Sequence, residues 1–423
     1  MGSNPGDNPP RSCLVTGGSG FVGQRLVEML VERGSKRVVS FDISDTPKDA
    51  RRCAEIEYVR GDLTNPDEVV NACNGVDCVF HIAALVGPYF PKDAYYKVLA
   101  PIQKERALPL RAHARQVNYE GTLNVLNACK RLGIKKIVMS SSPSTRFPYP
   151  DPNVEGLTED QLKAKNGGDF ARVFLQPYAE TKALGEALIR EACGSKQVLT
   201  CRRPTKRLQL TAFRQQGYCE YSIGAVQGDL LTIAVAPHQV YGPRDGLMLP
   251  SLLGAASTGR LRIFGSGQNL ISFCHVDNYC HGLMLGAEAL YPDSPALGKF
   301  YVITDDAPVK FWEVLDEAVI AMGFVSLSSK FKLPEWFMMT LAHIVVLLGN
   351  VYSFVSGTPK HVVNKYLKLN PFAVKMLVIH RYFDISAAKR DLKYKPLIQF
   401  ADGWKQTIQW FKANWLPTMK KGR

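Results

Sequence analysis

The sequence lacks the cysteine patterns that mark a metal site or a disulfide framework. None of its ten cysteines forms a Cys-x-x-Cys pair, and no His and Cys residues stand together at metal-ligand spacing. Scattered cysteines are typical of a reducing compartment, and the missing spacings argue against structural zinc. We therefore expect no metal in the functional site.

The N-terminal segment also lacks the features of a targeting sequence. Residues 1–11 are polar, rich in Gly, Asn and Pro, and contain no apolar core, so we expect a flexible N-terminus and no signal peptide. Met1-Gly2 does not begin a myristoylation signal, because position 6 is Gly6 instead of Ser or Thr.

Acidic residues are few relative to basic ones, and the net charge is +14. Half of that excess lies in residues 98–116 and 198–227, and residues 416–423 form a short basic tail. The other basic residues are interspersed along the chain and form no stripe. We therefore expect no nucleic-acid partner, whereas a basic surface is compatible with contact to anionic lipid.

Residues 336–357 contain no Asp, Glu, Lys or Arg. A membrane span needs about 20 mostly apolar residues, so this segment is of borderline length. Three interpretations stay open: a helix that docks on or dips into a membrane, an ordinary buried helix, and a full transmembrane helix, which His343, Asn350 and Ser353 disfavour.

Apolar runs of strand length alternate with helical stretches up to about residue 240. This alternation predicts an α/β fold of the Rossmann type, a doubly wound parallel sheet, over residues 12–240, with a smaller C-terminal α/β substrate-binding part over 241–415. The expected strands are 13–16, 37–41, 57–59, 78–82, 136–139 and 230–236, and the main helices are 24–33, 119–132, 177–193 and 400–415.

Gly17, Gly20 and Gly23 follow the first predicted strand and open the first helix. In a dinucleotide-binding loop the first glycine permits the tight turn, the second lets the backbone approach the pyrophosphate, and the third allows close packing. Asp42 ends the second strand, where a carboxylate accepts hydrogen bonds from a ribose 2′-hydroxyl and repels a 2′-phosphate. The pattern predicts NAD over NADP, with a turn-forming Asp42 as the alternative.

Tyr178 and Lys182 are four residues apart on one predicted helix, so their side chains share a face. An ammonium beside a phenol favours the phenolate, and a phenolate can take the proton of a secondary alcohol. Ser142 closes a serine run at the end of a parallel strand, where open α/β sheets place their ligands, and its hydroxyl could hydrogen-bond the same alcohol. A polar loop is the alternative interpretation of that run.

Taken together, the motifs resemble the extended short-chain dehydrogenase/reductase family, in its 3β-hydroxysteroid dehydrogenase branch. The motifs that carry the resemblance are Thr16 to Gly23, Gly61-Asp62-Leu63, His81 to Ala84, Val117 to Thr122, Ser140-Ser141-Ser142, Tyr178 to Lys182, Val240 to Arg244, His275 to Asn278 and Tyr382 to Ile385.

The resemblance implies a catalytic set of Ser142, Tyr178 and Lys182, with Ser141 as the fallback for the serine. Tyr178 would be the general base, and Lys182 would hold the nicotinamide ribose and lower the pKa of Tyr178. The family usually has an aromatic or small residue soon after the serine run, whereas this chain has Pro143-Ser144-Thr145, which places the substrate preference in doubt. The implied NAD contacts are Gly17, Gly20, Phe21, Val22, Gly23, Asp42, Asp62, Leu63, Ala83, Tyr178, Lys182, Pro237 and His238.

The implied reaction is NAD-dependent oxidation of the 3β-hydroxyl of a sterol or steroid. In a 4α-carboxysterol the product is a β-keto acid, which loses carbon dioxide readily because the developing carbanion delocalises into the ketone. The alternatives are a Δ5-3β-hydroxysteroid dehydrogenase/isomerase, a sugar-nucleotide epimerase or dehydratase, and a non-catalytic NAD-binding scaffold. We further expect contact with the cytoplasmic face of the endoplasmic reticulum membrane, with the cytoplasm as the alternative, and a possible homodimer.

Residues 98–116 and 198–227 interrupt the series of motifs that resemble the family. Neither segment shows clean helical or strand periodicity. Each begins with Val and ends with Gln. Valine codons begin with GT and one glutamine codon is CAG, and these are the usual sequences at the two borders of an intron. The hypothesis is that both are retained introns of a gene model, and genuine surface insertions are the rival, since loops tolerate added length. Sequencing the transcript across both junctions decides between the two.

Overall fold

A computed structural model describes residues 9–85, 116–147, 152–162, 174, 177–194, 200–201, 221–222, 230–358 and 369–421. Residues 98–115 of the first suspected insertion lie outside these ranges. The second lies outside them apart from the paired strands β7 (Thr200–Cys201) and β8 (Tyr221–Ser222).

Seven parallel strands form the central sheet in the order β13-β9-β5-β4-β1-β2-β3. The chain runs outward from β1 to β3 and then returns to the other side of β1, so the strand order reverses between β1 and β4. Open α/β sheets bind their ligands at such a switch point. The strands are β1 (Ser12–Thr16), β2 (Arg37–Asp42), β3 (Ile56–Arg60), β4 (Cys78–His81), β5 (Lys136–Ser140), β9 (Leu231–Pro237) and β13 (Phe300–Ile303).

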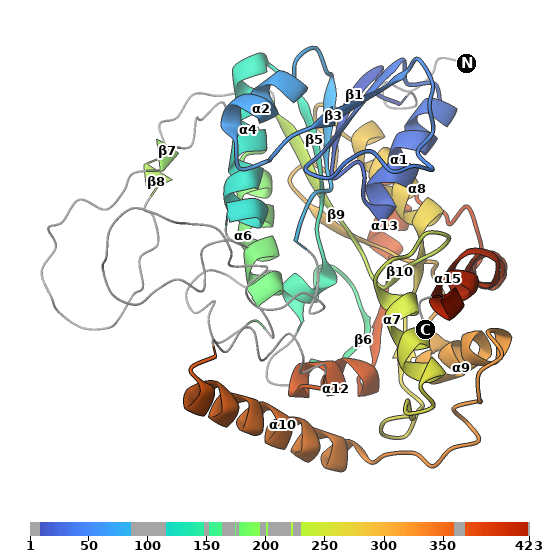
Figure 1. Cartoon of the computed structure of the whole chain (residues 1–423). Coiled ribbons are helices and arrows are strands. Elements are labelled where there is room, and N and C mark those ends of the chain that lie inside the picture. The colour runs from blue at the N-terminus through green and yellow to red at the C-terminus, as the bar shows by residue number, and fades with distance from the viewer. Residues whose placement is uncertain are drawn as a thin grey trace, which may run out of the picture.

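Helices cover both faces of this sheet (Figure 1). Cys13 and Val15 of β1 belong to the apolar core shared with α1 (Phe21–Glu32) and α8 (Val276–Glu288). Leu14 belongs to the core on the other face, shared with α2 (Pro66–Ala72), α4 (Thr122–Leu132) and α6 (Pro177–Glu191). Strand residues alternate between faces, so a sheet buried on both sides needs continuous apolar strands. This confirms the predicted doubly wound fold.

The remaining elements lie mostly beyond one end of the sheet. A four-stranded sheet has the order β14-β11-β15-β6, and β10 pairs with β12. The strands are β6 (Val154–Leu157), β10 (Val240–Tyr241), β11 (Leu270–Ile271), β12 (Cys274–His275), β14 (Val309–Lys310) and β15 (Arg381–Phe383). The helices are η1 (Gln116–Gly121), η2 (Pro143–Arg146), α7 (Met248–Ser257), α9 (Phe311–Ala321), α10 (Glu335–Ser356), α12 (Pro371–Val378), α13 (Ser386–Asp391), α14 (Phe400–Trp410), η3 (Phe411–Trp415) and α15 (Leu416–Lys421).

The chain passes between the two parts more than once. The strand β13 and the helix α8 follow residue 240 yet join the large sheet, whereas β6 precedes it and joins the small one. The sequence division into 12–240 and 241–415 therefore differs from the sheet membership, because pairing joins segments that are far apart along the chain.

The helix α10 coincides with the uncharged segment 336–357 and lies along the outer edge of the molecule beside α12 (Figure 1). It is long and apolar enough to cross a membrane, and only 17% of its most apolar 18-residue stretch is buried. The ordinary buried helix, one of the three interpretations of this segment, is therefore contradicted.

Candidate active site

The glycine loop lies at the carboxyl end of β1, at the switch point of the sheet. Gly17 has a φ of +74°, and a Cβ at this position would come within 2.9 Å of the backbone of Ala83. A Cβ on Gly23 would stand 1.9 Å from the carbonyl oxygen of Gly17. Only glycine fits either position, so the loop can fold tightly against the start of α1.

The N-terminus of α1 faces the cavity next to this loop. Gly20 is the N-cap and supplies no side chain to the first backbone amides of the helix. Those amides, together with the positive end of the helix dipole, suit a phosphate group. Phe21 and Val22 begin the helix and line the same cavity. The loop therefore fits the pyrophosphate of a dinucleotide.

Asp42 ends β2 beside the loop and lines the cavity. One of its carboxylate oxygens accepts a hydrogen bond from the Ser19 amide at 3.1 Å, and the other accepts one from the Ser44 amide at 2.9 Å. The residue therefore shapes a turn and presents a carboxylate to the cavity at the same time. Asp62 likewise lines the cavity and accepts a hydrogen bond from the Thr64 amide at 2.8 Å.

The other expected cofactor contacts come from three further strand ends. Ala83 follows β4 and lies against Gly17, and Leu63 follows β3. Pro237 ends β9, and His238 comes next. All four residues line the cavity that also contains the glycine loop.

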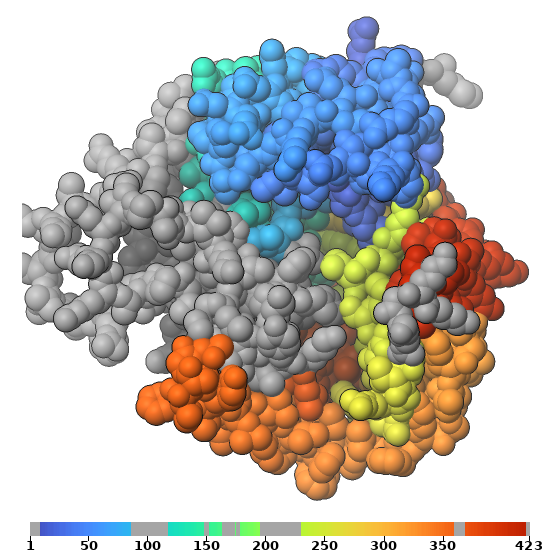
Figure 2. Space-filling view, viewed as in Figure 1, coloured from blue at the N-terminus to red at the C-terminus, as the bar shows by residue number. Residues whose placement is uncertain are grey.

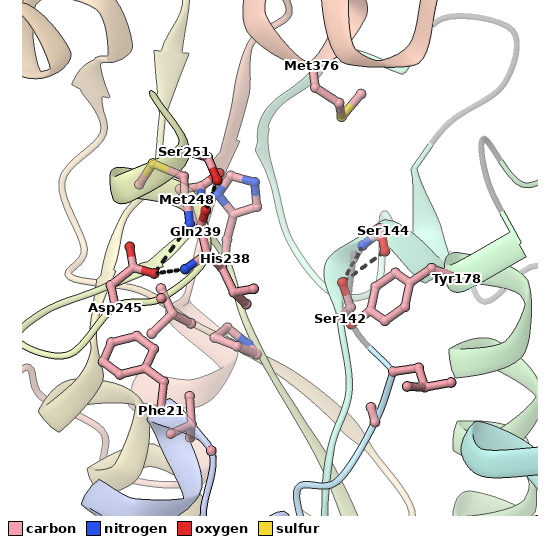
Figure 3. A pocket seen from close by; sticks show the side chains of 18 of the residues that line it. Phe21, Ser142, Ser144, Tyr178, His238, Gln239, Asp245, Met248, Ser251 and Met376 are labelled. Atoms are coloured by element: carbon pink, nitrogen blue, oxygen red, sulfur yellow. Dashed lines mark hydrogen bonds between the residues drawn. The ribbon is translucent and has the colours of Figure 1, made fainter. Parts of the chain in front are cut away.

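Ser142 and Tyr178 come from two different elements and lie side by side on one wall of the cavity (Figure 3). Ser142 is the N-cap of η2, and its hydroxyl lies 2.8 Å from the Ser144 hydroxyl. Tyr178 stands in the first turn of α6. Loss of hydration raises the pKa of Tyr178 to about 12, and a side-chain hydrogen bond with Ser142 partly offsets this rise. The phenol thus lies beside the serine predicted to assist it.

Ser141, the fallback for the catalytic serine, has a different environment. Its hydroxyl donates a 2.6 Å hydrogen bond to a carboxylate oxygen of Glu186, and both residues are buried. Arg146 pairs with the same carboxylate. Burial by itself raises the pKa of Glu186, but the hydrogen bond and charge of Arg146 outweigh it, so that the pKa is lowered. The geometry favours Ser142 over Ser141 as the partner of Tyr178.

Lys182 lies one helical turn beyond Tyr178 and is buried. Its ammonium donates a 2.6 Å hydrogen bond to the backbone oxygen of Ser140. Burial lowers the pKa of Lys182 to about 8, although the Glu186 carboxylate opposes this shift. Burial dominates the environment of Tyr178 and raises its pKa, and the lowering of that pKa by Lys182 stays a prediction.

His238 is fixed by two hydrogen bonds on the opposite side of the cavity. Its Nδ1 donates to the backbone oxygen of Ser272 at 2.6 Å, so its Nε2 can accept from Arg381 at 3.4 Å. Burial and the Arg381 guanidinium lower the pKa of His238 to about 3. The imidazole is therefore neutral near neutral pH and serves as a wall of the site, not as an acid.

Sequence reasoning missed Arg381, a buried residue of β15 that also lines the cavity. Its Nη2 donates to the backbone oxygen of Met376 at 2.9 Å. The guanidinium lies 143 positions from His238 along the chain, so no local motif could link the two. Only the adjacent Tyr382 to Ile385 motif offered a signal.

The cavity has a volume of about 1930 Å³, about twice the upper end of the range for a single drug-sized ligand. It has room for a dinucleotide and a second ligand. In Figure 3, Ser142, Ser144 and Tyr178 face His238, Gln239 and Met248, with Met376 farther along. Beyond the glycine loop the lining is largely apolar, from α7, α12 and their neighbours: Leu247, Met248, Leu252, Leu261, Phe264, Phe372, Met376 and Leu377.

Comparison with known proteins supplies a family context. The model of the 3-beta hydroxysteroid dehydrogenase/isomerase family matches residues 14–206 and 222–334. The unmatched residues 207–221 fall inside the second suspected insertion.

Two curated relatives match nearly the whole chain. Sterol-4-alpha-carboxylate 3-dehydrogenase, decarboxylating, from Homo sapiens is 30% identical over 409 residues, which cover 96% of this chain and 89% of the relative. The 3beta-hydroxysteroid-dehydrogenase/decarboxylase isoform 1 of Arabidopsis thaliana is 30% identical over 417 residues, which cover 95% of this chain and 80% of the relative.

Among solved structures, the chain is similar to DesIV, a dTDP-glucose 4,6-dehydratase from Streptomyces venezuelae with NAD bound. The TM-score is 0.60 at 19% identity, and the match covers 95% of this chain and 97% of the other. At this identity the similarity shows a shared fold.

Proposed function

The chain belongs to the 3-beta hydroxysteroid dehydrogenase/isomerase family, and we propose that it oxidises the 3β-hydroxyl of a 4α-carboxysterol, which then loses its carboxyl group as carbon dioxide. The observation that carries the proposal is that Ser142 and Tyr178 lie side by side in the cavity that also contains the glycine loop. The enzyme is an oxidoreductase acting on an alcohol carbon, and its cofactor is NAD.

When bound, NAD would supply the acceptor for the hydride of the alcohol carbon, and the chain supplies the rest of the chemistry. Gly17, Gly20 and Gly23 would hold the pyrophosphate at the helix terminus, and Asp42 would accept hydrogen bonds from the adenosine ribose. Phe21, Val22, Asp62, Leu63, Ala83, Pro237 and His238 complete the proposed cofactor contacts.

Tyr178 takes the proton of the 3β-hydroxyl, and Ser142 orients the alcohol oxygen through its hydroxyl. With a pKa of about 12, the phenol is protonated in the free protein at neutral pH. A positive charge near the phenol is needed to favour its ionised form. The proposed source is the Lys182 ammonium together with the nicotinamide ring of the oxidised cofactor.

Arg381 supports a carboxylated substrate over a neutral steroid. Its guanidinium is buried beside the apolar part of the cavity, where a charged partner gains most from a hydrogen-bonded ion pair. The apolar lining from α7 and α12 suits sterol rings and offers little to the phosphates of a sugar nucleotide. Once the 3-ketone has formed, no further protein group is required for decarboxylation, because the ketone itself accepts the electron pair.

The proposed setting is the cytoplasmic face of the endoplasmic reticulum membrane, reached through α10. Two observations support it: the apolar exposed face of this helix, and cysteines that are free wherever the structure describes their side chains, as expected in a reducing compartment. The expected homodimer stays a prediction.

NADH formation by the purified full-length chain tests the function. We expect turnover with a 4α-carboxysterol, release of one carbon dioxide per NADH, and a much lower kcat/KM with a neutral Δ5-3β-hydroxysteroid. Turnover of a UDP-sugar or dTDP-glucose without activity on either sterol would overturn the proposal.

A further inference from the structure

We propose that the sterol enters the site directly from a lipid bilayer, through a mouth between α10 and α12, while α10 lies flat on an anionic bilayer surface. The identity of the ligand rests on the proposed function. The mouth itself is inferred from the arrangement of α10, α12 and the cavity.

The helix α10 is anchored to the protein by a single stripe. Its buried residues are Met338, Ala342, Gly349 and Ser353, which recur at helical spacing. Met338 and Ala342 pack with Val374 of α12 in a small apolar core. A helix held along its length in this way lies parallel to the protein surface, so we infer a flat position on the bilayer and not a span.

The opposite face of α10 exposes large apolar side chains. Phe354 is 89% exposed, Trp336 is 71% exposed and Leu348 is 62% exposed. Phe331, just before the helix, is 70% exposed. A contiguous apolar surface of this kind is unfavourable in water, and it marks a contact with lipid or with another protein.

Cations around the start of α10 favour lipid as the occupant. Lys332 is exposed and donates to the backbone oxygen of Ser266, and the half-buried Lys330 donates to the backbone oxygen of Gly259. The Arg262 guanidinium lies 5.5 Å from the ring of Phe331. An apolar face bordered by lysine and arginine fits an interfacial helix on an anionic bilayer, because each basic residue is attracted to the anionic lipid headgroups.

The same helix reaches the cavity of the active site. Val346 of α10 lines that cavity, as do Leu369, Asn370 and Phe372 at the start of α12. Ser142 and Tyr178 line it as well, so one continuous space joins α10 to the reacting groups. Figure 2 shows the molecule hollowed beside α7, between the part that contains β1 to β3 and the base that contains α10.

The transfer of a sterol into water is unfavourable in proportion to the apolar surface that it exposes. Passage from the acyl chains to an apolar cavity wall avoids that cost. Val346 lies on the edge of α10 between the anchored stripe and the lipid-facing side, so a larger side chain there would narrow the mouth without changing either face.

The test compares Val346→Trp with Leu348→Trp, which adds the same side chain two residues away on the exposed face. Full-length protein with NAD is mixed with phosphatidylcholine/phosphatidylserine vesicles that carry a fluorescent 3β-hydroxysterol. Energy transfer from protein tryptophan then reports uptake without any turnover. Vesicle binding is measured by flotation, and NADH formation is measured with sterol delivered either in vesicles or in cyclodextrin.

We expect Val346→Trp to bind vesicles and NAD like the wild type but to take up sterol at least tenfold more slowly, whereas Leu348→Trp behaves like the wild type. Leu369→Trp blocks the mouth from the other side and gives a second estimate if the first variant folds poorly. Leu347→Asp should lose vesicle binding and retain turnover of cyclodextrin-delivered sterol.

Wild-type uptake by both mouth variants would overturn the proposal, as would failure of the wild type to bind anionic vesicles. The experiment separates the mouth from the function. If the wild type oxidises cyclodextrin-delivered sterol and the mouth variants take up sterol as fast as the wild type, the proposed function stands and the proposed mouth is wrong. If sterol uptake depends on Val346 but no sterol is oxidised, the proposed mouth stands and the proposed function is wrong.

Discussion

The Ser141 hydroxyl donates a 2.6 Å hydrogen bond to the buried carboxylate of Glu186, and this bond decides which serine of the run is available to Tyr178. The carboxylate also holds Arg146 at the end of η2, so it joins the serine loop to α6. With Ser141 fixed in this way, the next residue along the chain, Ser142, is the serine that lies beside the phenol.

Replacing Glu186 with Gln should destabilise the protein, because it leaves the Arg146 guanidinium buried without its charged partner. We expect the free energy of unfolding to fall by about 3 kcal/mol or more, measured by urea denaturation. The matched control is Lys310→Gln, which removes an exposed ion pair with Glu313 and should change stability by about 1 kcal/mol at most.

The pH dependence of this difference follows from the lowered pKa of Glu186. A carboxylate whose folded pKa is depressed contributes its stability above its ordinary pKa and loses it as the pH falls through the depressed value. Wild type and Glu186→Gln should therefore converge in stability in acid. A constant gap down to the acid transition would contradict the role given to this ion pair.

Tyr178→Phe should abolish most turnover while NAD still binds, because the ring stays in place and only the hydroxyl is lost. General acid–base catalysis contributes about 10²–10⁴-fold, so kcat should fall by that factor while the dissociation constant for NADH, from fluorescence titration, stays within about twofold. Turnover like that of the wild type would remove Tyr178 from the mechanism.

In the free protein, Tyr178 should remain protonated well above neutral pH, since its pKa is about 12. The difference in absorbance at the tyrosinate band between wild type and Tyr178→Phe should therefore be absent up to about pH 10. Oxidised NAD should shift this titration to lower pH, because its nicotinamide ring carries a positive charge. An unchanged titration with NAD bound would mean that the cofactor does not help to ionise the phenol.

Asp42→Ser should weaken NAD binding and relax the discrimination against NADP. The variant loses a charged acceptor for the ribose, which is worth about 1.5–3 kcal/mol, or about tenfold or more in KM for NAD. Asp45→Ser is the control, since Asp45 is exposed and pairs with Arg60 outside the cavity. Equal effects of the two substitutions would show that Asp42 acts only as a turn residue.

Arg381→Leu should lower kcat/KM for a 4α-carboxysterol by about tenfold or more, because an ion-paired hydrogen bond to the carboxylate is lost. Activity on a neutral 3β-hydroxysteroid should change far less. Arg381→Lys should restore part of the preference, as it keeps the charge without the planar fork. A parallel loss on both substrates would assign Arg381 to support of His238 instead.

Features that depend on neighbouring residues were predictable. The glycines at positions 17, 20 and 23 and the pairing of Tyr178 with Lys182 are local patterns, and they predicted the parallel sheet, its cofactor loop and the helix that carries the proposed base. The strand β13 was missed because its place in the sheet comes from pairing with β9, not from its own sequence.

By itself, the sequence determined the fold class, the NAD loop and the family, because each is encoded in short runs whose spacing is read along the chain. Tertiary structure alone decided that Ser141 turns to Glu186, that Arg381 reaches His238, and that α10 keeps an apolar face exposed. These properties arise from contacts between residues distant in the chain, or from their absence on one face, and no local pattern specifies which partner a buried polar group will find.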